Sequence, residues 1–193
     1  MASYLQAVHK YTLKASNAGN SYTMQVSSVP NAGTTKFNGS APAYSSVDTV
    51  TLDENGVVIG NHVSTDYFLV SPYVPLGRVS STGSPYGVVS SSSPLPSTLD
   101  VGSSGGVDSL TYYHDSTMST VDADDVLTYA VKTHDSTSLL LCLDSTMSNV
   151  TAQGTADDLV DDAESDCYTV DAAGNAALVS VTVTVNGATL TFE

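Results

Sequence analysis

The side-chain types of a hydrolase triad recur in three short stretches of the sequence. Residues 114–117 and 134–137 both read His-Asp-Ser-Thr, and Asp-Ser-Thr returns at residues 144–146. A nucleophilic triad needs its serine, histidine and acid to converge from separate parts of a fold. Neighbours cannot do this, because His114 and Asp115 would point to opposite faces of a strand. Asp followed by Ser-Thr is typical of a turn, so we predict no catalytic residue and no enzyme.

Two clusters of carboxylates could bind a metal ion. They are DADD at residues 122–125 and DDLVDDAESD at residues 157–166. Ca²⁺ takes six to eight oxygen ligands, but neither cluster has the spacing of an EF-hand loop. No His or Cys pair has the spacing of a zinc site. We interpret the clusters as solvated loop charge and predict no metal ion and no cofactor.

The charge of the chain excludes one class of partner. The 193 residues include 20 acidic and only five basic ones, for a net charge of −15. Nucleic-acid binders rely on Lys and Arg to displace counterions, so direct binding to DNA or RNA is not expected. No run approaches the roughly 18 apolar residues of a membrane span, and the first residues lack the pattern of a signal peptide. We therefore expect synthesis in the cytoplasm and no membrane contact.

Two cysteines are too few for a disulfide framework. Cys142 lies in the apolar run LLLCL, where a buried reduced thiol is the commoner outcome. Disulfides are rare in cytosolic proteins. We expect reduced thiols, while a bond between Cys142 and Cys167 stays open.

Three regions differ in composition along the chain. Residues 1–78 contain runs rich in β-branched and aromatic residues, with a hairpin signal at Asn55-Gly56. Residues 79–106 are mostly Ser, Gly and Pro, which cannot bury enough apolar surface to fold alone. We predict an all-β protein with an N-terminal β region of hairpins that docks onto a partner (1–78), a Ser/Gly/Pro-rich arm or linker (79–106) and an acidic β-sandwich domain (107–193).

The acidic region contains an internal repeat. Residues 115–121 match residues 144–150, and residues 123–127 are echoed by residues 156–160. Two similar β units in tandem suggest a sandwich, in which each unit covers the apolar face of the other.

Two resemblances extend this prediction. Asp-Ala-Ala-Gly-Asn at residues 171–175, followed by ALVSVTVTV, resembles the closing strands of bacterial immunoglobulin-like repeats, which implies an immunoglobulin-like sandwich and a binding or display role. More broadly, a Ser/Thr/Val-rich β protein with a Ser/Gly/Pro-rich arm is similar to the virion proteins of tailed bacteriophages. That resemblance implies a structural role in a virus particle.

One stretch combines the residues that most often anchor protein interfaces. Arg78, the only arginine of the chain, follows several tyrosines, and Tyr and Arg are enriched at interface hot spots. Apolar side chains of the Ser/Gly/Pro-rich region would add handles for a neighbour. The predicted interface residues are Tyr67, Tyr73, Arg78, Tyr86, Val88 and Leu95.

The leading hypothesis is a capsid decoration or cement protein that binds the outside of a phage head and stabilises it. Its partners would be the major capsid protein or another virion protein and further copies of itself, as a homotrimer or other homo-oligomer. It would reside in the virion after assembly in the host cytoplasm. Two alternatives remain: a structural protein of the phage tail, and a Ca²⁺-stabilised immunoglobulin-like adhesin or binding module.

Overall fold

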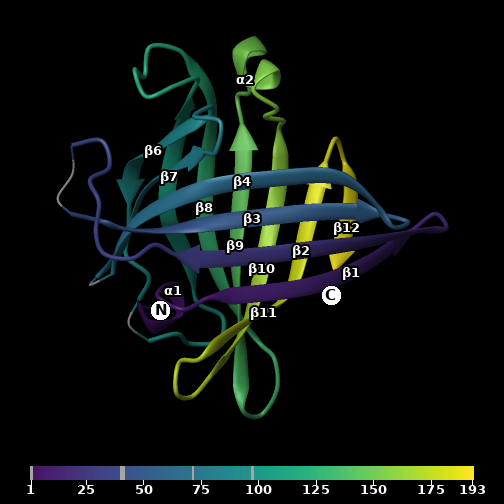
Figure 1. Cartoon of the computed structure of the whole chain (residues 1–193). Coiled ribbons are helices and arrows are strands. Elements are labelled where there is room, and N and C mark those ends of the chain that lie inside the picture. Colours follow the sequence, from purple (N-terminus) through teal and green to yellow (C-terminus); the bar gives the residue numbers. More distant parts are fainter. Residues whose placement is uncertain (1, 40–41, 71, 97) are drawn as a thin grey trace.

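The computed structural model describes residues 2–39, 42–70, 72–96 and 98–193, which form an all-β protein as predicted. Two helices of a single turn, α1 (Ala2–Leu5) and α2 (Ala152–Ala156), accompany the strands (Figure 1). None of the helices in the described residues is long and apolar enough to cross a membrane. The strands are β1 (His9–Asn17), β2 (Asn20–Pro30), β3 (Tyr44–Glu54), β4 (Val57–Val70), β5 (Tyr73–Ser80), β6 (Tyr86–Ser92), β7 (Ser104–Tyr113), β8 (Val121–Thr133), β9 (Ser138–Ser148), β10 (Asp162–Asp171), β11 (Ala176–Val185) and β12 (Ala188–Phe192).

Every strand pairs with the next one along the chain, in a single sheet ordered β1 to β12. All these pairs are antiparallel. Tight two-residue turns build several of the hairpins, because Asn55-Gly56 and Asn186-Gly187 both adopt the positive φ angles that such turns require. These two turns join β3 to β4 and β11 to β12, each as an antiparallel pair.

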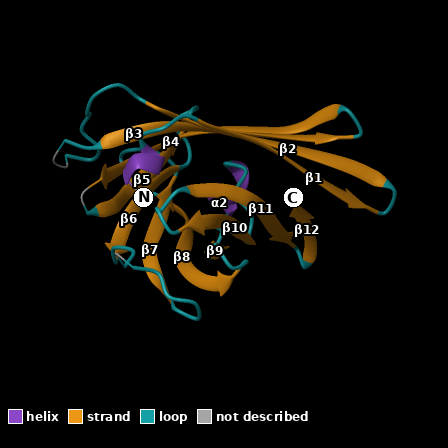
Figure 2. Cartoon of the chain, turned by 90° about the horizontal axis from the view of Figure 1, so that it is seen from below, coloured by secondary structure: helices purple, strands orange, loops and turns teal. Residues whose placement is uncertain are grey.

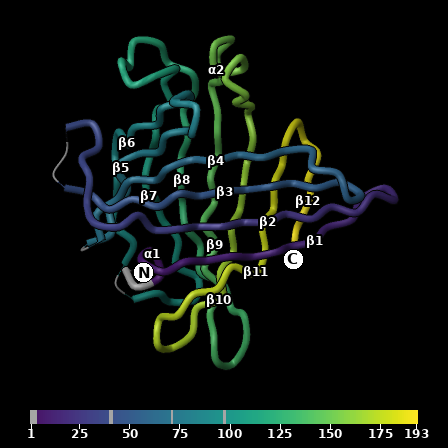
Figure 3. The backbone as a smooth tube through the Cα atoms, viewed as in Figure 1, coloured from purple at the N-terminus to yellow at the C-terminus, as the bar shows by residue number. Residues whose placement is uncertain are grey.

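The sheet curls until its first strand meets the end of the chain. Lys14 in β1 and Glu193, the residue after β12, exchange two backbone hydrogen bonds of 2.8 and 3.0 Å. Strands β1 to β4 consequently run across β8 to β11 at a steep angle (Figure 3). Seen from below, they form one layer, and the later strands form an arc beneath it (Figure 2). The curled sheet therefore encloses an interior.

Apolar side chains fill one end of this interior. The buried cluster joins β1 and β2 to β11 and β12, and its members are Leu13, Met24, Leu178, Val181 and Phe192. Phe192 is almost completely buried, with 1% of its surface exposed. Strand alternation sends every second residue to this face.

The middle of the chain contributes strands to the same sheet. Residues 79–106, for which composition predicted an arm or linker, contain β6 together with the end of β5 and the start of β7. Strand β6 pairs with β5 on one side and β7 on the other. The immunoglobulin-like sandwich expected for residues 107–193 is not confirmed, because β7 to β12 are consecutive neighbours in one sheet.

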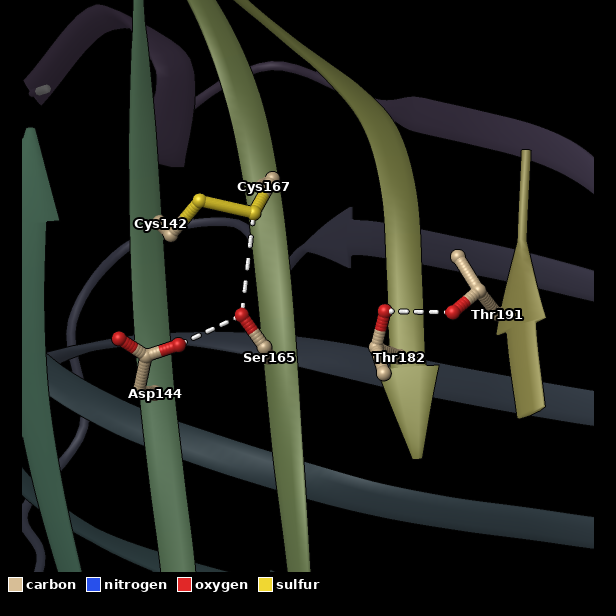
Figure 4. Close-up of a disulfide and its surroundings, with 6 residues drawn as sticks. All are labelled: Cys142, Asp144, Ser165, Cys167, Thr182 and Thr191. Atoms are coloured by element: carbon tan, nitrogen blue, oxygen red, sulfur yellow. Dashed lines mark hydrogen bonds between the residues drawn. A yellow bond between two sulfur atoms is a disulfide. The ribbon is translucent and has the colours of Figure 1, made fainter. Parts of the chain in front are cut away.

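Cys142 and Cys167 form a disulfide, so the expectation of reduced thiols is wrong. The two residues lie directly opposite each other in the register of β9 and β10. Opposite residues in an antiparallel pair project their side chains to the same face, about 5 Å apart. Figure 4 shows the bond joining the two strands. The strand register was not visible in the sequence, and it is what brings the two sulfurs together.

Candidate functional site

The curled sheet surrounds an interior cavity of about 360 Å³. Its lining comes from most of the strands and from α1. Alternate residues of one strand face the cavity, as Glu164, Asp166 and Tyr168 do on β10. Binding pockets for small molecules have volumes of about 300 to 1,000 Å³. The cavity is therefore large enough for a small organic ligand.

Acidic side chains dominate the polar part of this lining. Only one lysine or arginine, Arg78, is among the described lining residues. Arg78 is already engaged by Asp66, whose two carboxylate oxygens accept hydrogen bonds of 2.5 and 2.9 Å from the guanidinium. Such a bidentate pair satisfies both charges. Five other lining acids form no ion pair with any described residue: Asp48, Asp108, Asp125, Glu164 and Asp166.

Burial disfavours the ionised form of three of these acids, Asp48, Asp108 and Asp166. Removal from water raises the pKa of Asp48 to about 7, with a further contribution from neighbouring Asp66. Burial also raises the pKa of Asp108 and of Asp166 to about 7, helped by Asp125 and Glu164 respectively. A positive charge placed among these groups would favour their ionised form.

Arg78 reverses the direction of the pKa shift at Asp66. Burial alone would raise the pKa of Asp66, but the charge and hydrogen bonds of Arg78 outweigh burial and lower it. The Arg78 side chain is also 47% exposed, although it belongs to the cavity lining. The cavity therefore leaves room beside the Arg78–Asp66 pair.

Two oxygens of the lining lack hydrogen bonds. Oδ1 of Asp48 and Oδ1 of Asp166 are buried, and neither accepts a bond from any described residue. Most buried polar atoms in folded proteins have a partner, and leaving one unsatisfied costs about 1–3 kcal/mol. A molecule the size of water does not reach these two oxygens, so a ligand with N–H donors would bond to them only after their side chains rotate toward the cavity.

Aromatic rings share the cavity with the acids. The Tyr4 ring stacks on His9 with centroids 3.8 Å apart, and it meets Tyr168 edge to face at 5.8 Å. Burial raises the pKa of Tyr112 to about 12 and that of Tyr168 well above its usual value. These phenols therefore stay uncharged at neutral pH. Aromatic faces attract cations. The lining tyrosines are Tyr4, Tyr11, Tyr67, Tyr73, Tyr112 and Tyr168.

Four of the six predicted interface residues line this cavity, namely Tyr67, Tyr73, Arg78 and Leu95. Tyr86 instead stacks on Phe37, with ring centroids 5.3 Å apart. Val88 lies in β6, opposite a glycine of β5. For all six residues, contact with a partner protein stays a prediction.

The Asp-Ser-Thr stretches are turns in two of the three places. Oδ1 of Asp115 accepts a 2.8 Å bond from the backbone N–H of Thr117, and Oδ1 of Asp135 accepts one of 2.7 Å from that of Thr137. The turn interpretation is confirmed there. It is wrong for Asp144, which lies within β9 and accepts a hydrogen bond from Ser165.

The fold brings His114 next to a serine and an acid from other segments. Its Nδ1 lies 2.6 Å from Oδ2 of Asp157 and 3.4 Å from Oγ of Ser84. A catalytic triad requires the acid on one ring nitrogen and the serine on the other. Here both groups approach the same nitrogen, so the arrangement is not that of a triad.

The sequence matches no model of a protein family, and no significant match was found among curated proteins or among solved structures. A function for the chain therefore has to be inferred from the chemistry of its own residues.

Proposed function

We propose that the chain is a binding protein that holds a small organic cation, an amine attached to an apolar or aromatic group, in its interior cavity. The observation that carries the proposal is the excess of five cavity acids over the single Arg78–Asp66 pair. The field of such a cavity attracts cations and repels anions. Tyrosine rings and aliphatic side chains provide the apolar part of the site.

An organic cation fits this cavity better than a metal ion does. Among the described residues, the one group of acidic, His or Cys ligand atoms close enough to share a metal ion lies elsewhere, at His114. The cavity acids are spread over several strands. An extended ligand can contact carboxylates at one end and rings at the other, whereas a bare ion needs its ligands around one point.

Binding of a matched pair of probes tests the proposal. Protonated 2-phenylethylamine and neutral 2-phenylethanol have similar shapes and differ in charge. We expect the amine to bind at least tenfold more tightly, because both probes can donate a hydrogen bond but only the amine carries a positive charge that neutralises the cavity acids. Tyrosine fluorescence can report this, since the chain contains eleven Tyr and no Trp.

Substitutions of cavity residues test whether the amine binds in the cavity. Asp166→Asn and Asp48→Asn should each weaken amine binding about tenfold or more, which corresponds to roughly 1.4 kcal/mol. Asp100→Asn changes an exposed acid outside the cavity lining and should leave binding unchanged. Equal binding of the two probes, or an equal loss in Asp100→Asn, would contradict the proposal.

The capsid-decoration role, with its tail-protein and adhesin alternatives, remains a hypothesis drawn from composition and resemblance. A ligand cavity inside the sheet leaves the outer surface free for such contacts. Imaging of the protein mixed with phage heads tests that separate hypothesis.

A further inference from the structure

A second polar cluster lies outside the cavity, beside α2. His114 follows β7, Asp122 is the second residue of β8, and Asp157 caps the C-terminal end of α2. One ligand atom from each residue lies within 4.8 Å of the other two. None of the three lines the interior cavity. The cluster is therefore independent of the proposed amine site.

The packing of α2 against β8 holds this cluster together. The backbone N–H of Thr151 donates a 2.8 Å bond to the carbonyl oxygen of Asp122, and the Thr151 hydroxyl donates to that of Val121. A Cβ on Gly154 would lie 2.4 Å from the Asp122 carbonyl oxygen, so only glycine allows this approach. In Figure 1, α2 and the loop between β7 and β8 lie at the same end of the molecule.

Asp122 is the unusual member of the cluster. Its side chain is completely buried, with 0% exposed, and neither carboxylate oxygen accepts a hydrogen bond within the described part of the chain. An unpaired buried carboxylate is strongly unfavourable. A second carboxylate, that of Asp157, lies close by. Among the described residues, no lysine or arginine forms an ion pair with either carboxylate.

Several hydrogen-bonding groups surround the imidazole of His114. Nδ1 of His114 lies 2.6 Å from Asp157 Oδ2, 3.1 Å from Gln153 Nε2 and 3.4 Å from Ser84 Oγ. With its ring proton on Nδ1, His114 donates to Asp157 Oδ2, which also accepts a 3.2 Å bond from Gln153 Nε2. A metal ion at this point would replace that ring proton, because a histidine ligand binds through a deprotonated nitrogen.

We propose that His114, Asp122 and Asp157 bind a divalent transition-metal ion of the Zn²⁺ type. Imidazole is a preferred ligand of zinc, whereas Ca²⁺ and Mg²⁺ prefer oxygen alone. Ligand atoms lie about 2.0–2.2 Å from a bound zinc, so small side-chain rotations bring the three atoms to bonding distance. The His114 side chain is 45% exposed, which gives an ion access to the buried Asp122.

Calorimetric titration of the full chain with ZnCl₂, after treatment with a chelator, tests this site. We expect saturable binding of one Zn²⁺ per chain and a rise in Tm, since binding to the folded state stabilises it. His114→Ala and Asp157→Asn should each weaken binding at least tenfold. CaCl₂ and MgCl₂ at the same concentrations should bind at least tenfold more weakly than ZnCl₂.

His134 provides a matched control. Its Nδ1 lies 3.2 Å from Oδ2 of Asp135, but both side chains are exposed and the pair has no third ligand among the described residues. His134→Ala should leave zinc binding unchanged. Wild-type binding no tighter than that of His114→Ala, or an equal loss in His134→Ala, would overturn the proposal.

The Asp122→Asn variant distinguishes an effect on zinc binding from an effect on the stability of the fold. Without zinc this variant should be at least as stable as the wild type, because it removes an unpaired buried charge. It should also lose the zinc-dependent rise in Tm. A variant that keeps the full zinc response would exclude Asp122 as a ligand and overturn the three-residue site.

Discussion

Gly77 lies where aromatic rings leave no space for a side chain. The Phe37 ring stacks between Tyr67 and Tyr86, with centroid distances of 4.6 and 5.3 Å. A Cβ on Gly77 would lie 2.3 Å from the carbonyl oxygen of Gly87 and 2.5 Å from the Phe37 ring. Strand β5 can therefore approach this aromatic group only because residue 77 is glycine.

Gly77→Ala should destabilise the protein by about 1–3 kcal/mol, the usual cost of forcing extra atoms into a packed site. Gly60→Ala is the matched control, because the new Cβ would meet Leu52 at an ordinary 3.8 Å. Urea unfolding measures both changes. Equal stability of the two variants would show that the aromatic group is loosely packed.

At the level of single residues, the sequence predicts chemistry that is local. The turns at Asp115 and Asp135 were predictable, because each carboxylate accepts a bond from an amide two residues on. The contact between His114 and Asp157 was not, since 43 positions separate the two residues. The sequence signal nearest to this contact is the Asp-Asp pair at residues 157–158, which repeats the pair at residues 124–125. Both pairs were interpreted as solvated charge.

At the level of strands, pairing with neighbouring strands produces structure that composition alone does not predict. The turn at Asn55-Gly56 was predictable because the two residues alone satisfy the geometry of the turn. Strand β6 was not predictable, because it lies within residues 79–106, whose Ser/Gly/Pro-rich composition is typical of a linker. It forms through backbone hydrogen bonds to β5 and β7, which do not depend on the type of side chain.

Removing the link between β9 and β10 should weaken the fold. The Cys142–Cys167 bond closes a loop with a sequence separation of 25. We expect Cys142→Ser with Cys167→Ser to lower the free energy of unfolding by about 2–4 kcal/mol, mainly through a less restricted unfolded chain. Urea unfolding measures the loss. Dithiothreitol should reproduce it in the wild type and have no further effect on the double variant; a response of the double variant would contradict this explanation.

At the level of the whole molecule, the curl of the sheet creates the cavity, and no local pattern in the sequence indicates it. Arg78 and its neighbouring tyrosines were singled out from the sequence as a contact site, and the structure places most of them around an interior space. Carboxylates from distant strands, such as Asp48 and Asp166, meet there only after the first strand reaches the end of the chain.

This cavity should make stability depend on pH. Folded-state pKa values of about 7 for Asp48, Asp108 and Asp166 exceed the value of about 3.9 expected in the unfolded chain. The folded state then binds more protons between these limits, so the free energy of unfolding should fall as pH rises from about 4 to about 7. The fall should be on the order of 2 kcal/mol per group after screening by water in the cavity.

Urea unfolding at a series of pH values measures this dependence. Asp108→Asn and Asp166→Asn should each flatten the curve, because an amide does not titrate. Stability that rises between pH 5 and pH 7 would show that the cavity acids are well solvated.

The most direct test of a cation-binding cavity is calorimetric titration with 2-phenylethylamine at pH 5.5 and pH 8.5. The amine is protonated at both values, since its pKa is close to that of lysine, whereas the cavity acids ionise between them. We predict binding at least tenfold tighter at pH 8.5, with no such change for 2-phenylethanol. Equal affinity for the amine at the two pH values, or equal affinity for the two probes, would contradict the proposed function.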